Sequence, residues 1–234
     1  MTKTFIETFN LKKTYKHLDG NITLFNNLNI KINHGELVAL VGPSGSGKSS
    51  LLHLLALLDE PTNGEIKINK MNTKKFKSEE KDKIRQENIS IIFQDNNLLT
   101  DFTALENVYL ARLTVETNKN KALNDSKKII SKVGLTNRLN HFPSELSGGE
   151  IQRIAISRAL VNEPDIILAD EPTGNLDHST AKEVFNIFYK LKNKRRLIIY
   201  ATHNRFFADM SDCKLEMFNG NIRTSNAKNK RSKI

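Results

Sequence analysis

Three stretches of the chain are almost continuously apolar: 36–42 (ELVALVG), 165–171 (DIILADE) and 196–203 (RLIIYATH). Strands buried on both faces of a parallel sheet have such runs, whereas strands with one wet face alternate between apolar and polar residues. The stretches 5–11 (FIETFNL) and 22–32 (ITLFNNLNIKI) alternate more and suit an antiparallel edge. Further strands are expected at 64–69 and 89–94, and a hairpin joins 214–218 to 221–224 around Asn219-Gly220.

The region 95–146 has a different pattern, with apolar residues at helical spacing and no convincing strand. Its two clearest helical stretches are 103–113 (TALENVYLARL) and 120–134 (NKALNDSKKIISKVG). We therefore expect one α/β domain over 1–224, with a mainly parallel sheet, an antiparallel β edge and an inserted helical subdomain. The catalytic core would be 1–94 and 147–224, the helical subdomain 95–146, and 225–234 a basic, disordered tail.

Composition limits the environment and the partners. Cys213 is the single cysteine, so no disulfide framework is possible, and the N-terminus lacks the pattern of a secretion signal. The apolar run Leu54–Leu58 is far shorter than a membrane span. We therefore expect a soluble chain in a reducing compartment such as the cytoplasm. The net charge of +10 comes from scattered lysines rather than a patch, so no nucleic-acid partner is expected.

A glycine-rich stretch, GPSGSGKSS, lies directly between a buried strand and the apolar helix 51–58. This is the context that a phosphate-binding loop requires. The glycines let backbone amides surround the phosphates, Lys48 reaches the terminal phosphates, and the Ser49 hydroxyl binds Mg²⁺. The expected loop residues are Gly42, Pro43, Ser44, Gly45, Ser46, Gly47, Lys48, Ser49 and Ser50.

Two adjacent carboxylates, Asp170 and Glu171, end the second buried strand, where ligands of open α/β sheets gather. Asp170 would hold Mg²⁺ and Glu171 would polarise the attacking water. His203 and Gln94 end two further strands. A single histidine or glutamine at a strand end is most often a surface or capping residue. These two, however, are expected at the same sheet edge as Lys48, within reach of the γ-phosphate, Mg²⁺ or water.

The stretch LSGGE has two glycines at the start of an expected helix, although glycine destabilises a helix. Ser147 and Glu150 have the spacing of a capping box, which explains those two residues but not Gly148 and Gly149. Glycine is needed where φ is positive or where something approaches the backbone closely. A helix start with bare amides can bind an anion. The local pattern leaves open which anion this second site would bind and whether that anion is held by the same chain.

These motifs, together with FQ, GNLD and ATH, stand in the order and spacing found in the ABC ATPases, and the resemblance covers about 5–224. LSGGE is the signature of that family. The resemblance implies a P-loop NTPase fold, ATP and Mg²⁺ as ligands, and a sandwich dimer in which each signature caps the partner's γ-phosphate. It also implies the following roles: Tyr15 stacks on adenine; Ser49, Gln94 and Asp170 hold Mg²⁺; Ser147, Gly148 and Gly149 cap in trans; Glu171 is the base; Asp177 lies at the dimer interface; His203 senses the γ-phosphate.

Within the family, HLLALLDEPTNGEI, LLTDFTALENV and ATHN resemble a narrower group. It comprises the lipoprotein-releasing ATPases, the MacB-type efflux ATPases and the FtsE-type cell-division ATPases, and the resemblance to the first is the strongest. It implies a peripheral motor at the cytoplasmic face of a bacterial inner membrane, two copies of which bind integral membrane subunits. The alternatives are efflux, a cell-division role with slow turnover, or a non-transport ATPase acting on DNA or the ribosome.

Overall fold

The computed structural model describes residues 4–18, 20–193 and 195–226 of the 234-residue chain. Its centre is a six-stranded sheet in the order β10-β9-β3-β8-β7-β6. The parallel strands are β3 (Leu37–Val41), β6 (Ile89–Ile92), β7 (Ile166–Asp170), β8 (Leu197–Ala201) and β9 (Cys213–Phe218). Only β10 (Asn221–Asn226), at one edge, runs antiparallel. The three continuously apolar stretches are thus β3, β7 and β8, as predicted.

A separate antiparallel sheet, in the order β2-β1-β4-β5, corrects one expectation. The two alternating N-terminal stretches become β1 (Thr4–His17) and β2 (Gly20–Asn33), and they do not join the parallel sheet as its edge. Instead, β1 pairs on its other side with β4 (Asn63–Ile68), and β4 pairs with the short β5 (Met71–Asn72). The sequence did not predict this arrangement, because alternation shows that one face of a strand is exposed to solvent but does not show which strand pairs with it.

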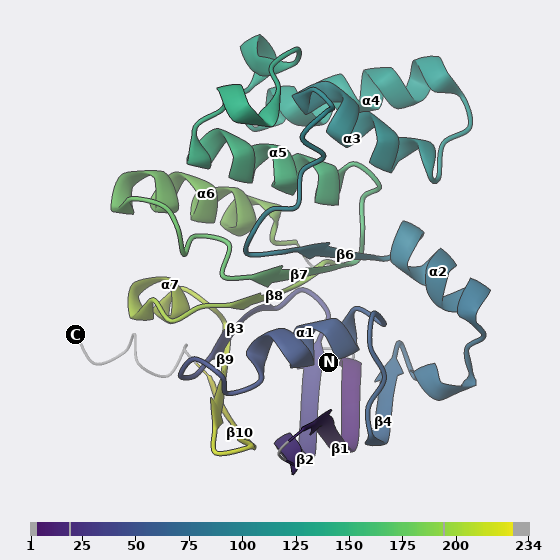
Figure 1. Ribbon diagram of the computed structural model, residues 1–234, viewed down its shortest axis with the longest axis vertical. Helices are drawn as coiled ribbons and strands as arrows, with labels where there is room; N and C mark the ends of the chain where they lie inside the picture. The colour runs from purple at the N-terminus through teal and green to yellow at the C-terminus, as the bar shows by residue number, and fades with distance from the viewer. Residues whose placement is uncertain (1–3, 19, 194, 227–234) are drawn as a thin grey trace.

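Helix α1 (Lys48–Leu55) lies between the two sheets, whereas α5 (Gly148–Leu160), α6 (His178–Leu191) and α7 (Arg205–Asp209) cover the opposite face of the parallel sheet (Figure 1). Alternate residues of β3 pack into two hydrophobic cores, one on each face of the parallel sheet. Val38 and Leu40 belong to the core around α1, and Leu37 and Ala39 to the core under α5 and α6. A strand buried on both faces has to be apolar throughout, which explains the continuous runs.

The helical subdomain consists of α3 (Ala104–Leu113) and α4 (Lys119–Lys132) stacked on α5 (Figure 1). Two short 3₁₀ turns, Thr136–Arg138 and Pro143–Glu145, lead from α4 back to α5. A core of its own joins the three helices and includes Val108, Ile130 and Ile154. One more helix, α2 (Ser78–Glu87), follows the 3₁₀ turn Thr73–Lys75 and leads into β6.

The C-terminal region differs slightly from the expected tail. Strand β10 extends through Ser225 and Asn226, which pair with Lys214 and Cys213 of β9. These two residues therefore continue the sheet, and the rest of the expected tail, 227–234, lies outside the described residues. Among the helices of the described part of the chain, none combines the length and the apolar character needed to cross a membrane.

Candidate active site

The phosphate-binding loop connects β3 to α1, at the carboxyl end of the central strand. Lys48 begins α1, is 8 % exposed, and donates hydrogen bonds to the carbonyl oxygens of Gly42 and Pro43, both at 3.0 Å. Gly47 precedes it with φ +95°, and a Cβ there would lie 3.1 Å from the Phe25 ring. The glycine is therefore needed both for its backbone conformation and for space.

A cavity of about 630 Å³ opens beside this loop and joins most of the residues that the sequence singled out. Strands β1, β2 and β7, the loop with the start of α1, and the segments that follow β6, β7 and β8 contribute to it. The predicted residues that line it are Tyr15, Ser44, Gly45, Gly47, Lys48, Ser49, Ser50, Gln94, Asp170, Glu171 and His203. Residues more than 180 positions apart in sequence thus meet at the carboxyl edge of the parallel sheet, where such sheets place their ligands.

Glu171 directly follows β7, and its backbone is held in the left-handed region with φ 45°. Its amide donates to the carbonyl of Ala201 on β8 at 3.2 Å. Its side chain is largely buried and lies 3.0 Å from the Nδ1 atom of His203. A left-handed conformation is costly for a residue with a Cβ and persists where the surroundings impose it, often at functional sites. The two side chains are therefore held as a pair at the cavity.

The residues suit a nucleotide with Mg²⁺. The buried Ser46 Oγ atom in the loop has no hydrogen-bond partner, as expected where a phosphate oxygen would supply one. Asp170 is 7 % exposed and lines the same cavity as Ser49 and Gln94. No group of three His, Cys, Asp or Glu side chains among the described residues has metal-binding geometry. Mg²⁺ held here would need phosphate oxygens and water as further ligands, which is usual for this ion.

The signature residues lie elsewhere. Ser147, Gly148, Gly149 and Asp177 do not line this cavity, although every one of them is in the described part of the chain. Ser147 caps α5, and it forms the predicted capping box with Glu150: the Ser147 amide donates to Glu150 Oε2 at 2.8 Å. Asp177 caps α6 and accepts hydrogen bonds from the Ser179 and Thr180 amides.

The two signature glycines have different surroundings. Gly149 is buried against α6, and a Cβ there would lie 2.3 Å from Thr180 Cγ2. Gly148 is exposed, and a Cβ there would meet only Leu176 Cδ2, at 3.6 Å. Close packing within the chain therefore accounts for Gly149, and Gly148 is the one whose bare backbone faces outward.

Several lining residues were not among the predicted ones. Ile22 and Leu24 on β2, and Gly174 and Asn175 after β7, also line the cavity. Ile22 is 50 % exposed although it is large and apolar. The alternation of β2 places Ile22 and Leu24 on the same face of the strand. This spacing was the only sequence feature that could have indicated that both residues face a ligand.

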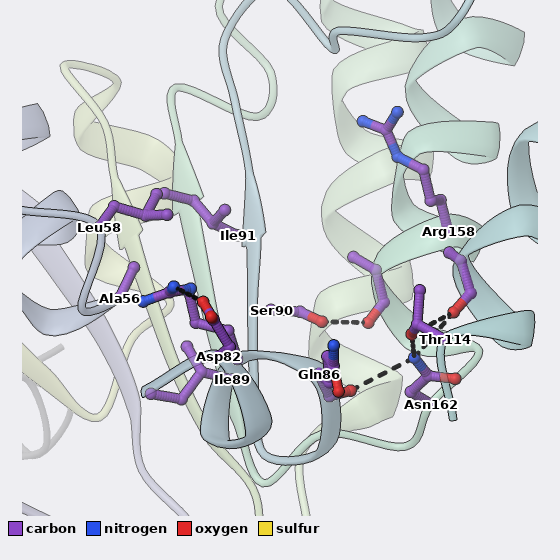
Figure 2. Close-up of a pocket in the computed structure, with 13 residues that line it drawn as sticks. Ala56, Leu58, Asp82, Gln86, Ile89, Ser90, Ile91, Thr114, Arg158 and Asn162 are labelled. Carbon is purple, nitrogen blue, oxygen red and sulfur yellow. Dashed lines mark hydrogen bonds and ion pairs between the residues drawn. The ribbon is translucent and has the colours of Figure 1, made fainter. Parts of the chain in front are cut away.

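A second cavity, of about 430 Å³, lies along the edge strand β6 between α1, α2 and the helical subdomain (Figure 2). Asn162 lines it, and its side-chain amide donates to the carbonyls of Gln86 and Ala111 (Figure 2). Arg158 lines the same cavity and donates to the carbonyls of Asn96 and Asn97, at 2.6 Å each. These two residues follow Gln94 closely, so the segment after Gln94 is fastened to α5.

Comparison with known proteins agrees with this geometry. Residues 25–174 match the family model described as ABC transporter. The lipoprotein-releasing system ATP-binding protein LolD of Rickettsia bellii is 43% identical over 96% of this chain and 100% of that relative. LolD of Wigglesworthia glossinidia brevipalpis is 43% identical over 93% of this chain and 95% of its own length.

Solved structures give the same result. The dimeric structure of a post-hydrolysis state of the ATP-binding cassette MJ0796, bound to ADP and Pi, has a TM-score of 0.88 and 35% sequence identity. It covers 95% of this chain and 98% of that one. The chain therefore belongs to the ABC transporter family of ATP-binding proteins, which it shares with the LolD proteins.

Proposed function

We propose that this chain is the ATP-hydrolysing motor subunit of a lipoprotein-releasing transporter of the LolCDE type, bound to the cytoplasmic face of a bacterial inner membrane. The observation that carries the ATPase activity is the single cavity where Lys48, Glu171 and His203 meet. The support for lipoprotein release is the similarity to LolD proteins over nearly the whole chain.

Each group in the cavity would have a separate task. The phosphate-loop amides and Lys48 would hold the triphosphate, and Tyr15 would stack on the base. Ser49, Gln94 and Asp170 would hold Mg²⁺, which supplies charge neutralisation of the phosphates when bound. Glu171 would accept a proton from the attacking water, and His203, 3.0 Å from Glu171, would keep that carboxylate in place and contact the γ-phosphate.

The site would be completed by a second copy of the chain. Ser147 and Gly148 of one protomer would cap the γ-phosphate bound by its partner, with Asp177 at the interface. Two observations support this: the exposed start of α5 does not line the chain's own nucleotide cavity, and the MJ0796 relative is described as dimeric. Such a head-to-tail arrangement of two copies contains two equivalent composite sites.

The membrane subunits, LolC-like and LolE-like, would dock in the cavity along β6 (Figure 2). Leu58, which is 47 % exposed, and Ile91 give it an apolar side, while Arg158 connects it to the segment after Gln94. A shift of a docked segment would therefore displace Gln94 and so alter the nucleotide site. A displacement of Gln94 on ATP binding would in turn shift the docked membrane subunits.

The test is reconstitution. The chain is co-purified with its membrane subunits, placed in vesicles with a lipid-anchored lipoprotein, and supplied with ATP. We expect ATP-dependent release of the lipoprotein and loss of release in Glu171→Gln. ATP hydrolysis without lipoprotein release, combined with export of a small molecule or with no transported substrate, would contradict the lipoprotein-releasing role. Absence of hydrolysis would contradict the motor role itself.

A further inference from the structure

The hydroxyl of Tyr15 is fixed by a residue that belongs to none of the nucleotide-binding motifs. It donates to Asp59 Oδ2 at 3.0 Å, and Ser50 Oγ lies 3.4 Å from it. Asp59 stands four residues after the end of α1, in the turn that leads toward β4. The shorter contact makes Asp59 the main acceptor for the single phenolic proton.

Asp59 is in turn held by Lys13. The Lys13 side chain is 9 % exposed, and its ammonium donates to Asp59 at 2.7 Å and to the Glu60 carbonyl at 2.9 Å. Partial burial alone would raise the pKa of the Asp59 carboxyl, but hydrogen bonds from Lys13, the Glu60 amide and Tyr15 outweigh it and hold this pKa below its usual value. Asp59 is therefore an ionised acceptor with a fixed geometry, and such charge-assisted bonds are the stronger ones.

The same ammonium also lies over the Tyr15 ring, 4.6 Å from its centroid. One face of the ring therefore has a cation–π partner from within the chain. Tyr15 lines the nucleotide cavity, so a flat ligand would use the other face. Lys13 and Tyr15 stand on β1, whereas Asp59 and Ser50 are attached to α1, the helix that begins at the phosphate loop. The network thus ties the ring to the element that would hold the phosphates.

We propose that Asp59 is a positioning residue for the nucleotide base: together with Lys13 it holds the Tyr15 ring at a set distance from the phosphate loop, so that a purine and its triphosphate bind together. This rests on the proposed placement of ATP in the cavity. A ring whose orientation is already fixed before the ligand binds loses less conformational freedom on binding, and this favours ligands that have an aromatic base. Asp59 does not line the nucleotide cavity, so it would act on the base only through Tyr15.

The experiment compares two probes, ATP and inorganic tripolyphosphate, by calorimetry on the full chain. In Asp59→Asn and in Tyr15→Phe we expect the ATP dissociation constant to rise about three- to tenfold, which corresponds to about 0.7–1.4 kcal/mol. Tripolyphosphate affinity should stay unchanged in Asp59→Asn, because the phosphate loop is untouched. In the assembled complex, Asp59→Asn should raise KM for ATP and leave kcat within about twofold.

The matched control is Glu60→Gln. Glu60 is the adjacent carboxylate, is mostly exposed and pairs with Lys81. We expect no change for either probe. The double variant Asp59→Asn/Tyr15→Phe should lose no more ATP affinity than the larger of the two single losses, because both substitutions act on the same charge-assisted hydrogen bond. The conservative Asp59→Glu should recover part of the affinity, since the carboxylate is kept.

Two results would overturn the proposal. Equal loss of ATP and tripolyphosphate affinity in Asp59→Asn would indicate a general structural role, and additive losses in the double variant would show that Asp59 does not act through Tyr15. Failure of the proposed function itself gives a different result. If the unmodified chain binds tripolyphosphate as tightly as ATP, and Tyr15→Ala changes neither, then the base does not lie on Tyr15 at all.

Discussion

The Oε2 atom of Glu171 lies 3.0 Å from the Nδ1 atom of His203. The two residues follow adjacent parallel strands, β7 and β8, and the register of Asp170 opposite Ala201 brings their ends level. Glu171 is largely buried whereas His203 is mostly exposed, with side-chain exposures of 12 % and 70 %. The histidine can therefore reach a ligand in the cavity while it holds the carboxylate that would take the proton.

The Glu171→Gln substitution should separate binding from hydrolysis. Glutamine keeps the size and the hydrogen-bonding capacity but cannot accept the proton of water, so we expect kcat to fall by about 10²- to 10⁴-fold. The ATP dissociation constant should change little, because the phosphate-loop contacts remain. Phosphate release and calorimetry measure the two quantities. Glu183→Gln, at an exposed position on α6, is the control and should keep full activity. A comparable loss of kcat in both variants would show that Glu171 is not the catalytic base.

The two signature glycines should respond differently to alanine. Gly149→Ala places a methyl group 2.3 Å from Thr180 Cγ2 and should lower the free energy of unfolding by about 1–3 kcal/mol through overpacking. Gly148→Ala meets only an ordinary contact with Leu176 and should be neutral or slightly stabilising. Urea denaturation measures both. Thr180→Ser, which removes Cγ2, should rescue Gly149→Ala. Equal stability of the two alanine variants would show that the α5–α6 packing is not as described.

Arg158 should matter for coupling to the membrane subunits. Its guanidinium holds the carbonyls of Asn96 and Asn97, and both of these asparagines have positive φ, so the segment after Gln94 has a fixed shape. Arg158→Gln cannot make the same pair of bonds. We expect the ATPase of the isolated chain to change less than twofold, and its stimulation by the membrane subunits to fall several-fold.

The control for Arg158 is Arg153→Gln, on the same helix, where the guanidinium pairs with the exposed Glu183 of α6 instead of with the segment after Gln94. Stimulation should be retained in that variant. If Arg158→Gln lost activity equally in the isolated chain and in the complex, its role would be in nucleotide turnover rather than in coupling.

The capping box at the signature should give a measurable pH dependence. Hydrogen bonds from Arg138 and from the Ser147 amide lower the pKa of the Glu150 carboxyl from 4.5 to about 2. A carboxyl whose pKa is lower in the folded chain contributes stability above pH 4.5, and this contribution is lost as pH falls from 4.5 to 2. The unfolding free energy should therefore fall more steeply between pH 5 and about pH 3 in the unmodified chain than in Glu150→Gln. Parallel curves would contradict the assignment.

Local motifs made much of this molecule predictable. The strand, loop and helix around Lys48, the continuously buried strands and the capping box at Ser147 are each encoded within about a dozen adjacent residues. Other features were not predictable because they depend on distant partners. The pairing of β1 with β4 placed the antiparallel strands in their own sheet. The approach of Thr180 to Gly149 depends on how α6 packs on α5, and the bond from Tyr15 to Asp59 joins positions 44 residues apart.

Weak local signals account for the remaining differences. Strand β5 has two residues, too few for any alternation to show. Helix α2 has no buried residue, so its sequence has no apolar stripe. Ile22 and Leu24 looked like ordinary residues of an alternating strand, and only the fold shows that they face the nucleotide cavity.

The composite site between two chains is the central claim, and sedimentation with and without ATP tests it most directly. Glu171→Gln should retain ATP because it should not hydrolyse it, and in this variant we expect a dimer with ATP and a monomer with ADP. In the same background, Gly148→Asp adds a carboxylate at the exposed start of α5, where the fold should tolerate it. Its negative charge would, however, repel the γ-phosphate bound by the partner. We predict that this double variant binds ATP and remains a monomer. Dimerisation unaffected by Gly148→Asp, or no ATP-dependent dimer of Glu171→Gln, would contradict the composite site.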